Sequence, residues 1–600
     1  MPLPSNVQLT IAIAACVLTA SATLADEPLT TPPLPDGTKA AQAQIAGFRV
    51  PPGMKVELFA AEPQLYSPVA IGLDERGRVF VAEEFRFNRG TEENRTRPFF
   101  LEDDLQIKTL DDRLAMYRKF ADKFEGGMDW FRKYTDQVRL LEDQDGDSRA
   151  DKSTIFAGGL NDTLDGLAAG VMAGDGDVYL TNIPHLWRLR DEDGDGVAEK
   201  REKLLTGFGV NAGFLGHDLH GLVWGPDGRL YFSVGDRGFH VKTKEGTTLA
   251  TPRRGAVFRC EPDGSGLEVV HIGLRNPQEL AFDELGNLFA DDNNCDKGDH
   301  ARLVLIVPGG DSGWNMAYQT IPSPYETGPW HAEKMWHLDE PDAETVRPAF
   351  CLPPLGKLGA GPSGFAYCGA AGWPEKMRGR FYMCNYTGNG GIESFAVKPK
   401  GAAYELIDTQ DVFKPIQATD CEFGYDGRLY VSDFVGLEWN GGSRGGRIYT
   451  LSDPALLKTE VVTEVQKLFH EGFRQRENDE LAALLKHSDM RVRQRAQFAL
   501  AERGEKAIGV FVTATEQRDH LLSRLHGIWG LGQVARKSPA AAKSLLGLLA
   551  DEEPEVRANA AKTLGDLRLA TAGEPLLKLL KDEHPRVRFW AATALGQIKH

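Results

Sequence analysis

The sequence contains few cysteines, and none of them form a closely spaced pair. Seven cysteines occur in 600 residues, and no CxxC or CxxCH pattern is present. These absences exclude a zinc ribbon and a c-type haem attachment site within this chain. Besides Cys16 there are six cysteines, and their spacing leaves any disulfide pairing open.

Positive charge is also in short supply. The chain has 69 Lys and Arg residues against 86 Asp and Glu residues, a net charge of −17. Nucleic-acid binding requires a basic surface that neutralises phosphates, so this balance excludes a nucleic-acid partner. Glycine, in contrast, is abundant at 65 residues, which favours many tight turns between short strands over an all-helical protein.

Long apolar runs are absent after residue 25, so nothing later in the chain is expected to span a membrane. Residues 7–25 are uncharged, rich in small residues and end in small-residue cleavage patterns near Ala22 and Ala25. This predicts a signal peptide over residues 1–25 and an exported protein, in the periplasm or at the cell surface. The lack of a basic residue before it leaves an uncleaved membrane anchor open, and Cys16 leaves a lipid anchor open.

A short phrase recurs from residue 74 to 433, in which an Asp-Gly turn precedes alternating apolar residues. Three intervals between successive turn glycines are 52, 58 and 48 residues, which is the span of a four-stranded propeller blade. Two longer intervals indicate insertions at 88–134 and 322–354. Six phrases therefore predict six blades, with 445–451 as the last strand and 54–60 closing the ring. The turn glycines are Gly77, Gly176, Gly228, Gly286, Gly379 and Gly427.

The composition changes near residue 480, where Ala and Leu dominate and a period of about 32 residues begins. Leu500, Leu531, Leu564 and Leu595 mark this period. Such paired helices resemble HEAT repeats, which stack into an α-solenoid. We expect Val492, Val556 and Val587 to be buried between repeats. The last repeat helix ends at His600, so we also expect the array to continue beyond this chain.

The predicted fold is therefore an all-β six-bladed propeller followed by an all-α HEAT-like solenoid. The expected boundaries are a signal peptide (1–25), a leader (26–44), the propeller (45–455), a linker (456–476) and the solenoid (477–600).

The most distinctive motif lies at 216–238, GHDLHGLVWGPDGRLYFSVGDRG. His217 and His220 precede a strand, and Asp236 and Arg237 follow the next one. Histidine titrates near neutral pH, so it can take a proton from an alcohol as a hydride leaves. An isolated histidine is also often a structural group that caps a loop. The segments GLRNPQELAF (273–282) and PGGDSGW (308–314) follow further along the chain.

Together these segments resemble the glucose/sorbosone dehydrogenase superfamily, the soluble quinoprotein propellers. The opening GFRVPPGMKVELFAAEP (47–63) further resembles planctomycete-type membrane-bound dehydrogenases, which combine a propeller, HEAT repeats and a terminal haem module. The resemblance implies that His217 is the general base and that Arg275 and Asn276 contact cofactor or substrate. We also assign His220, Asp236 and Arg237 of the 216–238 motif to cofactor binding. The resemblance places haem c only in a module outside this chain.

The resemblance also implies pyrroloquinoline quinone, but one feature of the sequence argues against it. The relatives hold the quinone carboxylates with two arginines before the last Asp-Gly turn, and this chain has Gln417 and Thr419 there. A tricarboxylate without those cations is poorly compensated.

Acidic loops point to calcium. Asp191, Asp193, Asp195 and Glu202 match a D-x-D-x-D-G-x5-E calcium loop, although its flanks indicate strands instead of EF-hand helices. The segment at 143–151 repeats the beginning of this pattern, and a solvated acidic hairpin tip is the alternative for both loops. A third cluster includes Asp292 and Asn293, and the corresponding loop of the quinoprotein relatives supplies calcium ligands.

These features predict a calcium-assisted sugar or alcohol dehydrogenase that passes electrons to a cytochrome module or protein. Its substrate would be a sugar or polyol-like small molecule, and its solenoid could hold a protein partner. The alternatives are a non-catalytic binding scaffold and a calcium-dependent lactonase, because fold does not fix function. For the dehydrogenase we expect His217, Arg275 and the Asp292–Asn293 pair to converge at one end of the propeller axis.

Overall fold

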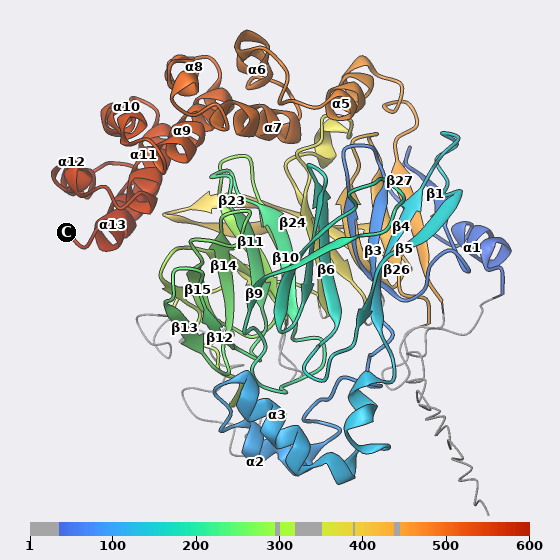
Figure 1. Cartoon of the computed structure of the whole chain (residues 1–600). Coiled ribbons are helices and arrows are strands. Elements are labelled where there is room, and N and C mark those ends of the chain that lie inside the picture. Colours follow the sequence, from blue (N-terminus) through green and yellow to red (C-terminus); the bar gives the residue numbers. More distant parts are fainter. Residues whose placement is uncertain (1–34, 294–299, 318–350, 360, 388–389, 437–444) are drawn as a thin grey trace, which may run out of the picture.

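The computed structural model describes residues 35–293, 300–317, 351–359, 361–387, 390–436 and 445–600. It contains a six-bladed β-propeller followed by a helical solenoid that arches over one end of it (Figure 1). The predicted fold class is thus confirmed. The predicted signal peptide and most of the second predicted insertion lie outside the described residues. No helix within the described ranges is long and apolar enough to cross a membrane.

Each blade is a four-stranded antiparallel core whose first strand lies nearest the axis, and the first strands of neighbouring blades contact each other around a closed ring. The first three blades are β2 (Pro68–Leu73), β3 (Val79–Glu83), β4 (Asp136–Glu142), β5 (Lys152–Leu160); β6 (Ala168–Gly174), β7 (Asp177–Asn182), β8 (His185–Arg190), β9 (Lys200–Thr206); and β10 (Leu219–Trp224), β11 (Leu230–Val234), β14 (Gly255–Cys260), β15 (Glu268–Leu274). The other three are β16 (Pro277–Phe282), β17 (Leu288–Asp292), β18 (Arg302–Ile306), β20 (Gly356–Lys357); β21 (Pro362–Tyr367), β22 (Phe381–Asn385), β23 (Gly391–Lys400), β24 (Ala403–Phe413); and β25 (Ala418–Phe423), β26 (Leu429–Asp433), β27 (Arg447–Ser452), β1 (Lys55–Ala60).

The N-terminal strand closes the ring, as predicted. β1 pairs with β27, so the sixth blade combines strands from the two ends of the propeller segment. The short helix α1 (Thr38–Ile45) packs beside this blade, where the Tyr449 hydroxyl donates a hydrogen bond to the Ala41 carbonyl. The predicted leader therefore ends in a helix that is part of the propeller. Additional strands are β12 (Phe239–Lys242), β13 (Thr248–Thr251) and β19 (Gly310–Asp311), which pairs with β15.

Asp-Gly turns connect the first two strands of most blades. In the fourth blade the Asp283 carboxylate accepts hydrogen bonds from the backbone N–H groups of Leu285 (2.9 Å) and Asn287 (2.8 Å). Gly286 has a φ of 77°, a left-handed conformation that glycine adopts without steric cost. The recurring phrase in the sequence is therefore a turn signal.

The predicted first insertion separates β3 from β4 and covers the end of the propeller opposite the solenoid (Figure 1). It contains α2 (Leu101–Asp104), α3 (Leu110–Lys119), and the 3-10 turns η1 (Pro98–Phe100), η2 (Ala121–Lys123) and η3 (Gly127–Arg132). The buried Asp104 carboxylate ties this insertion to the loop between β9 and β10 by accepting the backbone N–H groups of Ala212 (2.7 Å) and Gly213 (3.2 Å).

The solenoid begins with α5 (Glu460–Glu471), within the segment that we expected to be a linker. Four helix pairs follow: α6 (Asn478–Leu484) and α7 (Met490–Ala501), α8 (Ile508–Thr515) and α9 (Leu521–Ala535), α10 (Ala542–Gly547) and α11 (Pro554–Asp566), α12 (Gly573–Leu579) and α13 (Pro585–Gln597). Val492, Val556 and Val587 are each completely buried, which confirms the predicted repeat register.

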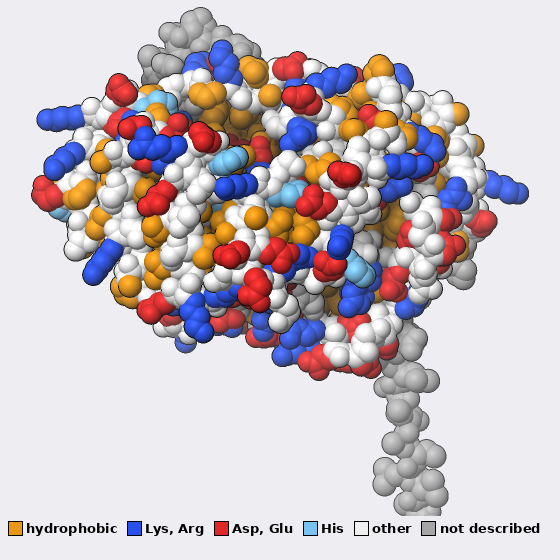
Figure 2. All heavy atoms as spheres, turned by 90° about the horizontal axis from the view of Figure 1, so that it is seen from above, with side chains coloured by type: hydrophobic (Ala, Val, Ile, Leu, Met, Phe, Trp, Pro, Cys, Tyr) orange, Lys and Arg blue, Asp and Glu red, His pale blue; other side chains and the backbone are white. Residues whose placement is uncertain are grey.

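The second helices of these pairs dock directly onto the propeller turns. Arg495 pairs with Glu75 (2.7 Å) and Asp175 (2.6 Å), and Lys562 donates to the Gly286 carbonyl (2.7 Å). Any side chain at position 286 would meet the Trp529 ring at 2.7 Å. One face of the solenoid is therefore used within the chain. On the face seen from the solenoid side, acidic and basic side chains are interspersed (Figure 2).

The docked solenoid lies over the far end of the axial channel. A cavity of about 210 Å³ lies there, roofed by Met490 and Arg491 of α7. The acidic residues Glu279, Asp420 and Glu422 line it from the inner strands of two blades. Burial raises the pKa of Asp420 to about 7. Glu422 is exposed to the cavity, and desolvation by the surrounding protein raises its pKa to about 8.

Candidate active site at the propeller mouth

A histidine and an aspartate form a buried pair at the end of the propeller opposite the solenoid. His217 precedes β10, and Asp236 follows β11, so antiparallel pairing of these strands brings the two residues together. The His217 Nδ1 atom lies 2.6 Å from Asp236 Oδ1. Gly235 permits this approach, since a Cβ atom there would lie 2.8 Å from the His217 backbone. The other oxygen of Asp236 accepts a hydrogen bond from the Trp314 indole (2.8 Å).

This environment favours the neutral form of the histidine. His217 is only 4% exposed. Burial lowers its pKa, Asp236 acts in the opposite direction, and the positive charge of Arg275 lowers it further. Because a carboxylate accepts at Nδ1, the proton of the neutral imidazole is assigned to Nδ1. Within the described residues Nε2 has no hydrogen-bond partner, so its lone pair is available to accept a proton.

Arg275 and Asn276 join the same site from the neighbouring blade. The Asp236 backbone N–H donates to the Arg275 carbonyl (2.7 Å), and the Arg275 guanidinium lies over the Trp314 ring at 5.9 Å. The Asn276 side chain donates to the Gly216 carbonyl (3.0 Å), next to His217. The structure thus brings His217 and Arg275 together, as the blade geometry predicts.

Asp292 also reaches this site, but as a structural clamp. Its carboxylate accepts the backbone N–H groups of Arg275 (3.0 Å) and Asn276 (2.7 Å) and pairs with Arg302 (3.1 Å). Both oxygens of Asp292 thus hold neighbouring groups in place, and its expected role as a calcium ligand stays a prediction. The Asn293 backbone N–H donates to the Asn276 carbonyl (3.1 Å), and residues 294–299 lie outside the described residues.

His220 and Arg237 are also structural here, where the sequence predicted cofactor contacts. His220 Nε2 lies 3.0 Å from the Gly216 carbonyl, and Arg237 is 1% exposed. Arg237 pairs with Asp218 (3.2 Å) and with Glu92 of the insertion (3.2 Å). Both side chains hold the loop that carries His217, and His220 also lines the axial cavity described next, so the predicted cofactor contacts stay predictions.

A cavity of about 90 Å³ lies on the axis beside this loop, lined by residues from all six blades. None of its lining residues in the described part of the chain is Lys or Arg, and two, Glu84 and Asp218, are carboxylates. Thr419, at one of the quinone-arginine positions, lines the cavity and donates to the Pro68 carbonyl (2.8 Å). This lining does not fit a tricarboxylate quinone, because it adds negative charge where cations are needed.

Comparison with known proteins places the propeller in a family. The profile of a family described as a domain of unknown function, DUF7133, matches residues 40–438. The chain belongs to this family. A HEAT-repeat profile matches residues 542–600, so the DUF7133 propeller is followed here by HEAT repeats.

The propeller is similar to quinoprotein sugar dehydrogenases. Over 142 residues the chain is 28% identical to quinoprotein glucose dehydrogenase B of Acinetobacter calcoaceticus, covering 19% of this chain and 29% of that protein. The chain thus matches less than a third of that relative's length. Among solved structures, PQQ-bound aldose sugar dehydrogenase from Streptomyces coelicolor gives a TM-score of 0.39 at 17% identity, covering 67% of this chain and 99% of that one. The PQQ domain of pyranose dehydrogenase from Coprinopsis cinerea gives 0.40 at 12% identity, covering 68% and 97%.

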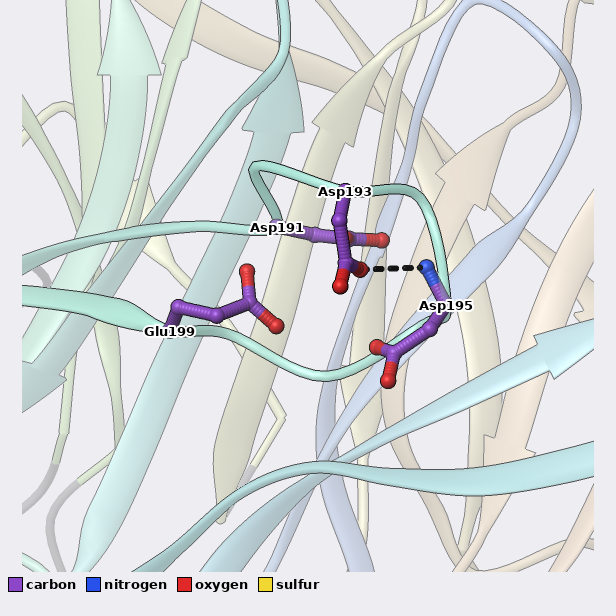
Figure 3. A group of neighbouring side chains, drawn as sticks. All are labelled: Asp191, Asp193, Asp195 and Glu199. Carbon is purple, nitrogen blue, oxygen red and sulfur yellow. Dashed lines mark hydrogen bonds between the residues drawn. The ribbon is translucent and has the colours of Figure 1, made fainter.

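The DUF7133 propeller carries its acidic loops away from the mouth site, on the hairpins between the third and fourth strands of two blades. On the β8–β9 hairpin, Asp191, Asp193, Asp195 and Glu199 each offer an oxygen within 4.8 Å of the others. Their carboxylates turn toward a shared space (Figure 3). This supports part of the predicted ligand set.

Glu202 is not part of that set, which corrects the sequence prediction. After residue 199 the chain enters β9, where Glu202 lies opposite Arg188 and pairs with it at 2.6 Å. An EF-hand helix would bring position 12 of the loop back toward the ion, but a strand carries it away. Glu199, at position 9, takes its place.

The β4–β5 hairpin repeats this arrangement with Asp143, Asp145 and Asp151. Its backbone hydrogen bonds match as well: Asp143 accepts from Gly146 (2.7 Å) and Ser148 (2.8 Å), as Asp191 accepts from Gly194 (2.6 Å) and Gly196 (3.0 Å). Both hairpins therefore adopt the same conformation, although only the β8–β9 hairpin has the full calcium-loop sequence pattern.

Sequence reasoning identified the histidine but not its supporting groups. Asp236 was assigned to cofactor binding, whereas it orients His217, and Trp314 holds Asp236. The sequence signal for Asp236 was its place in a Gly-Asp pair at the end of β11, the strand that pairs with the one His217 precedes. Glu84 and Asp218 were not predicted, although Asp218 lies within the 216–238 motif, because the sequence does not show that the two residues line one cavity.

Proposed function

We propose that this DUF7133 protein is an oxidoreductase acting on a CH–OH group of a sugar or polyol-like small molecule. The observation that carries the proposal is the Asp236–His217 pair, whose Nε2 atom has no partner in the described residues. A neutral, oriented imidazole at the mouth of a propeller is suited to remove a hydroxyl proton.

In this mechanism, His217 Nε2 takes the hydroxyl proton while the carbon-bound hydrogen leaves as a hydride and the carbonyl forms. Asp236 stabilises the imidazolium that results, as the carboxylate of a catalytic triad does. Arg275, held over Trp314, places positive charge where the alkoxide develops. His217 and Arg275 would thus act on the same substrate oxygen.

The hydride requires a two-electron acceptor beside the substrate. The described cavity lining does not fit pyrroloquinoline quinone, so we derive no step through that group. We propose that electrons finally reach a cytochrome module or protein, which the resemblance to membrane-bound dehydrogenases supports. The uncharged N-terminal segment supports export to the periplasm or cell surface, with a membrane anchor as a variant of this proposal.

We further propose calcium at the two acidic hairpins. Four and three carboxylates offer closely spaced oxygens there, which is the ligand chemistry that calcium prefers. These hairpins lie on outer strands, so calcium there would stabilise the propeller without taking part in the reaction. The face of the solenoid that is not docked is available for a protein partner.

A dye-linked assay tests the function directly. The purified protein is given a panel of sugars and polyols with an artificial electron acceptor, with and without added quinone. Oxidation that is lost in His217→Asn supports the proposal. If the protein instead hydrolyses lactones without an electron acceptor, His217 activates a water molecule. If the folded protein shows neither oxidation nor hydrolysis, the result favours a non-catalytic binding scaffold.

A further inference from the structure

Two buried carboxylates in the axial mouth cavity have oxygens without a hydrogen-bond partner. Glu84 directly follows β3 of the first blade, and Asp218 directly precedes β10 of the third. Glu84 is 7% exposed and Asp218 is fully buried, and both line the 90 Å³ cavity. Glu84 Oε1 and Asp218 Oδ2 have no partner in the described structure. Buried polar atoms are nearly always satisfied, so this pair requires an explanation.

The nearby arginines already interact with other groups. Asp218 Oδ1 pairs with Arg237 at 3.2 Å, but the same guanidinium also pairs with Glu92. Arg86, the next cation along the chain, directs its guanidinium to four backbone carbonyls, those of Gly90, Phe131, Asp165 and Gly166. Glu84 therefore has no counter-cation among the described residues.

A third carboxylate adds to the negative potential. Asp136 lies close enough to repel Glu84, and its own oxygens accept the backbone N–H groups of Phe85 (2.7 Å), Arg86 (3.0 Å) and Ala168 (3.1 Å). Burial and repulsion from Asp136 and Asp218 raise the pKa of Glu84 well above its usual range. Uncompensated buried carboxylates either hold protons or bind a cation.

We propose that Glu84 and Asp218 bind a hard divalent cation such as Ca²⁺ in the axial mouth cavity. The available donors are oxygens, because the His220 Nε2 atom already contacts the Gly216 carbonyl. Oxygen-only donors select calcium-like ions over zinc. A cavity of about 90 Å³ has room for an ion and about two waters, at roughly 30 Å³ each, and these waters would supply part of its coordination shell.

This site is distinct from the hairpin loops and does not depend on the proposed reaction. It lies on the axis, close to the loop that carries His217, because Asp218 follows that residue directly. A bound cation would neutralise the mouth and fix the loop. The site would therefore exist whether the protein oxidises, hydrolyses or only binds its ligand.

The test first eliminates calcium binding at the two acidic hairpins by neutralising their carboxylates. A background variant carries Asp143→Asn, Asp151→Asn, Asp191→Asn and Glu199→Gln, and it is titrated with Ca²⁺ alone by calorimetry and with Mn²⁺ alone by electron paramagnetic resonance. We expect one remaining site per chain. Adding Glu84→Gln or Asp218→Asn should weaken it by about tenfold or more, since even changes outside the first ligand shell cost that much. Glu422→Gln, in the far cavity on the same axis, is the matched control and should leave it unchanged.

Two results would overturn the proposal. One is a folded background variant that binds neither ion. The other is unchanged affinity in both Glu84→Gln and Asp218→Asn. In either case Glu84 holds a proton instead, which infrared spectroscopy would detect as a carboxylic acid band lost in Glu84→Gln. If these variants fold poorly, Glu84→Asp keeps the charge, and in it the calcium-induced rise in melting temperature should be smaller than in the background variant but still present.

Discussion

His217 and Asp236 are joined at 2.6 Å across one hairpin, and the Trp314 indole fixes the second oxygen of the aspartate at 2.8 Å. This chain of contacts determines which nitrogen of the imidazole carries the proton. It also excludes rotation of the ring, because Asp236 is completely buried and held at both oxygens. The reactive nitrogen is therefore Nε2.

The first prediction concerns this pair. His217→Asn should reduce oxidation by about 100-fold or more, since general base catalysis contributes about 10²–10⁴-fold. Asp236→Asn should also reduce it strongly, because an amide offers its nitrogen or oxygen to Nδ1 and no longer enforces the tautomer. His470→Asn, at an exposed position on α5, is the control and should have full activity. Full activity in His217→Asn would remove the general-base role.

The second prediction concerns pH. The pKa of His217 is lowered by burial, with Arg275 lowering it further, so the imidazole remains neutral and active below its ordinary value of 6.5. The acid limb of the kcat/KM profile should therefore lie below pH 6.5. Arg275→Gln removes a positive charge and should move this limb to higher pH. Arg201→Gln, on an outer strand, is the control, and an unmoved limb in Arg275→Gln would show that the base is another group.

The fold was predictable because its signals are local. An aspartate that accepts two backbone N–H groups, followed by a glycine in the left-handed region, appears in the sequence as a repeated phrase, as at Asp283 and Gly286. The solenoid register was equally accessible, since Val492 and its equivalents follow the period of the helix pairs. Such patterns need only neighbouring residues.

The site was less predictable because its groups come from different blades. Asp292 follows a strand at the mouth, which suggested a metal ligand, but the backbone of Arg275 and Asn276 occupies it. Glu84 and Asp218 are 134 positions apart in the sequence and meet only in the closed ring. Loop spacing alone also assigned Glu202 in place of Glu199, because it assumed a helix where the chain forms a strand.

The third prediction separates these two glutamates. Glu199→Gln should weaken calcium binding at the β8–β9 hairpin by about tenfold or more, because its carboxylate lies within 4.8 Å of the three aspartates. Glu202→Gln, only three positions away, should leave binding intact, since that residue pairs with Arg188. Titration of each variant in a protein with the β4–β5 hairpin neutralised would measure the difference. Equal loss in both variants would contradict the hairpin geometry.

The fourth prediction uses the far axial cavity. The surrounding protein desolvates Glu422, which is exposed to the cavity, and together with repulsion from Asp420 this raises its pKa to about 8, against an ordinary value of 4.5. The folded protein thus holds a proton that the unfolded chain releases, and stability is lost as the pH rises from about 4.5 to about 8. Glu422→Gln should therefore stabilise the protein at pH 8. The gain should be only about 1 kcal/mol, because water in the cavity screens the exposed side chain. At pH 4 the substitution should have little effect. Equal effects at both pH values would show that Glu422 is ionised throughout.

The last prediction concerns how the solenoid is held on the propeller. Arg491 donates to the Phe423 (2.6 Å) and Gly424 (2.9 Å) carbonyls of the sixth blade while pairing with Asp489, which is completely buried. Burial acts to raise the pKa of Asp489, but Arg491 and its hydrogen bonds lower it overall, so both groups are charged.

Arg491→Ala would leave the Asp489 carboxylate buried and unpaired, which costs about 3–5 kcal/mol, and would also remove two contacts to the propeller. Chemical denaturation should show this loss, with the solenoid unfolding at lower denaturant than the propeller. Arg518→Ala is the matched control, because Arg518 and Glu552 form an ion pair whose side chains are 76% and 84% exposed, and it should change stability by less than about 0.5 kcal/mol. If the two variants were equally stable, the docking of α7 on the sixth blade would contribute nothing to holding the two domains together.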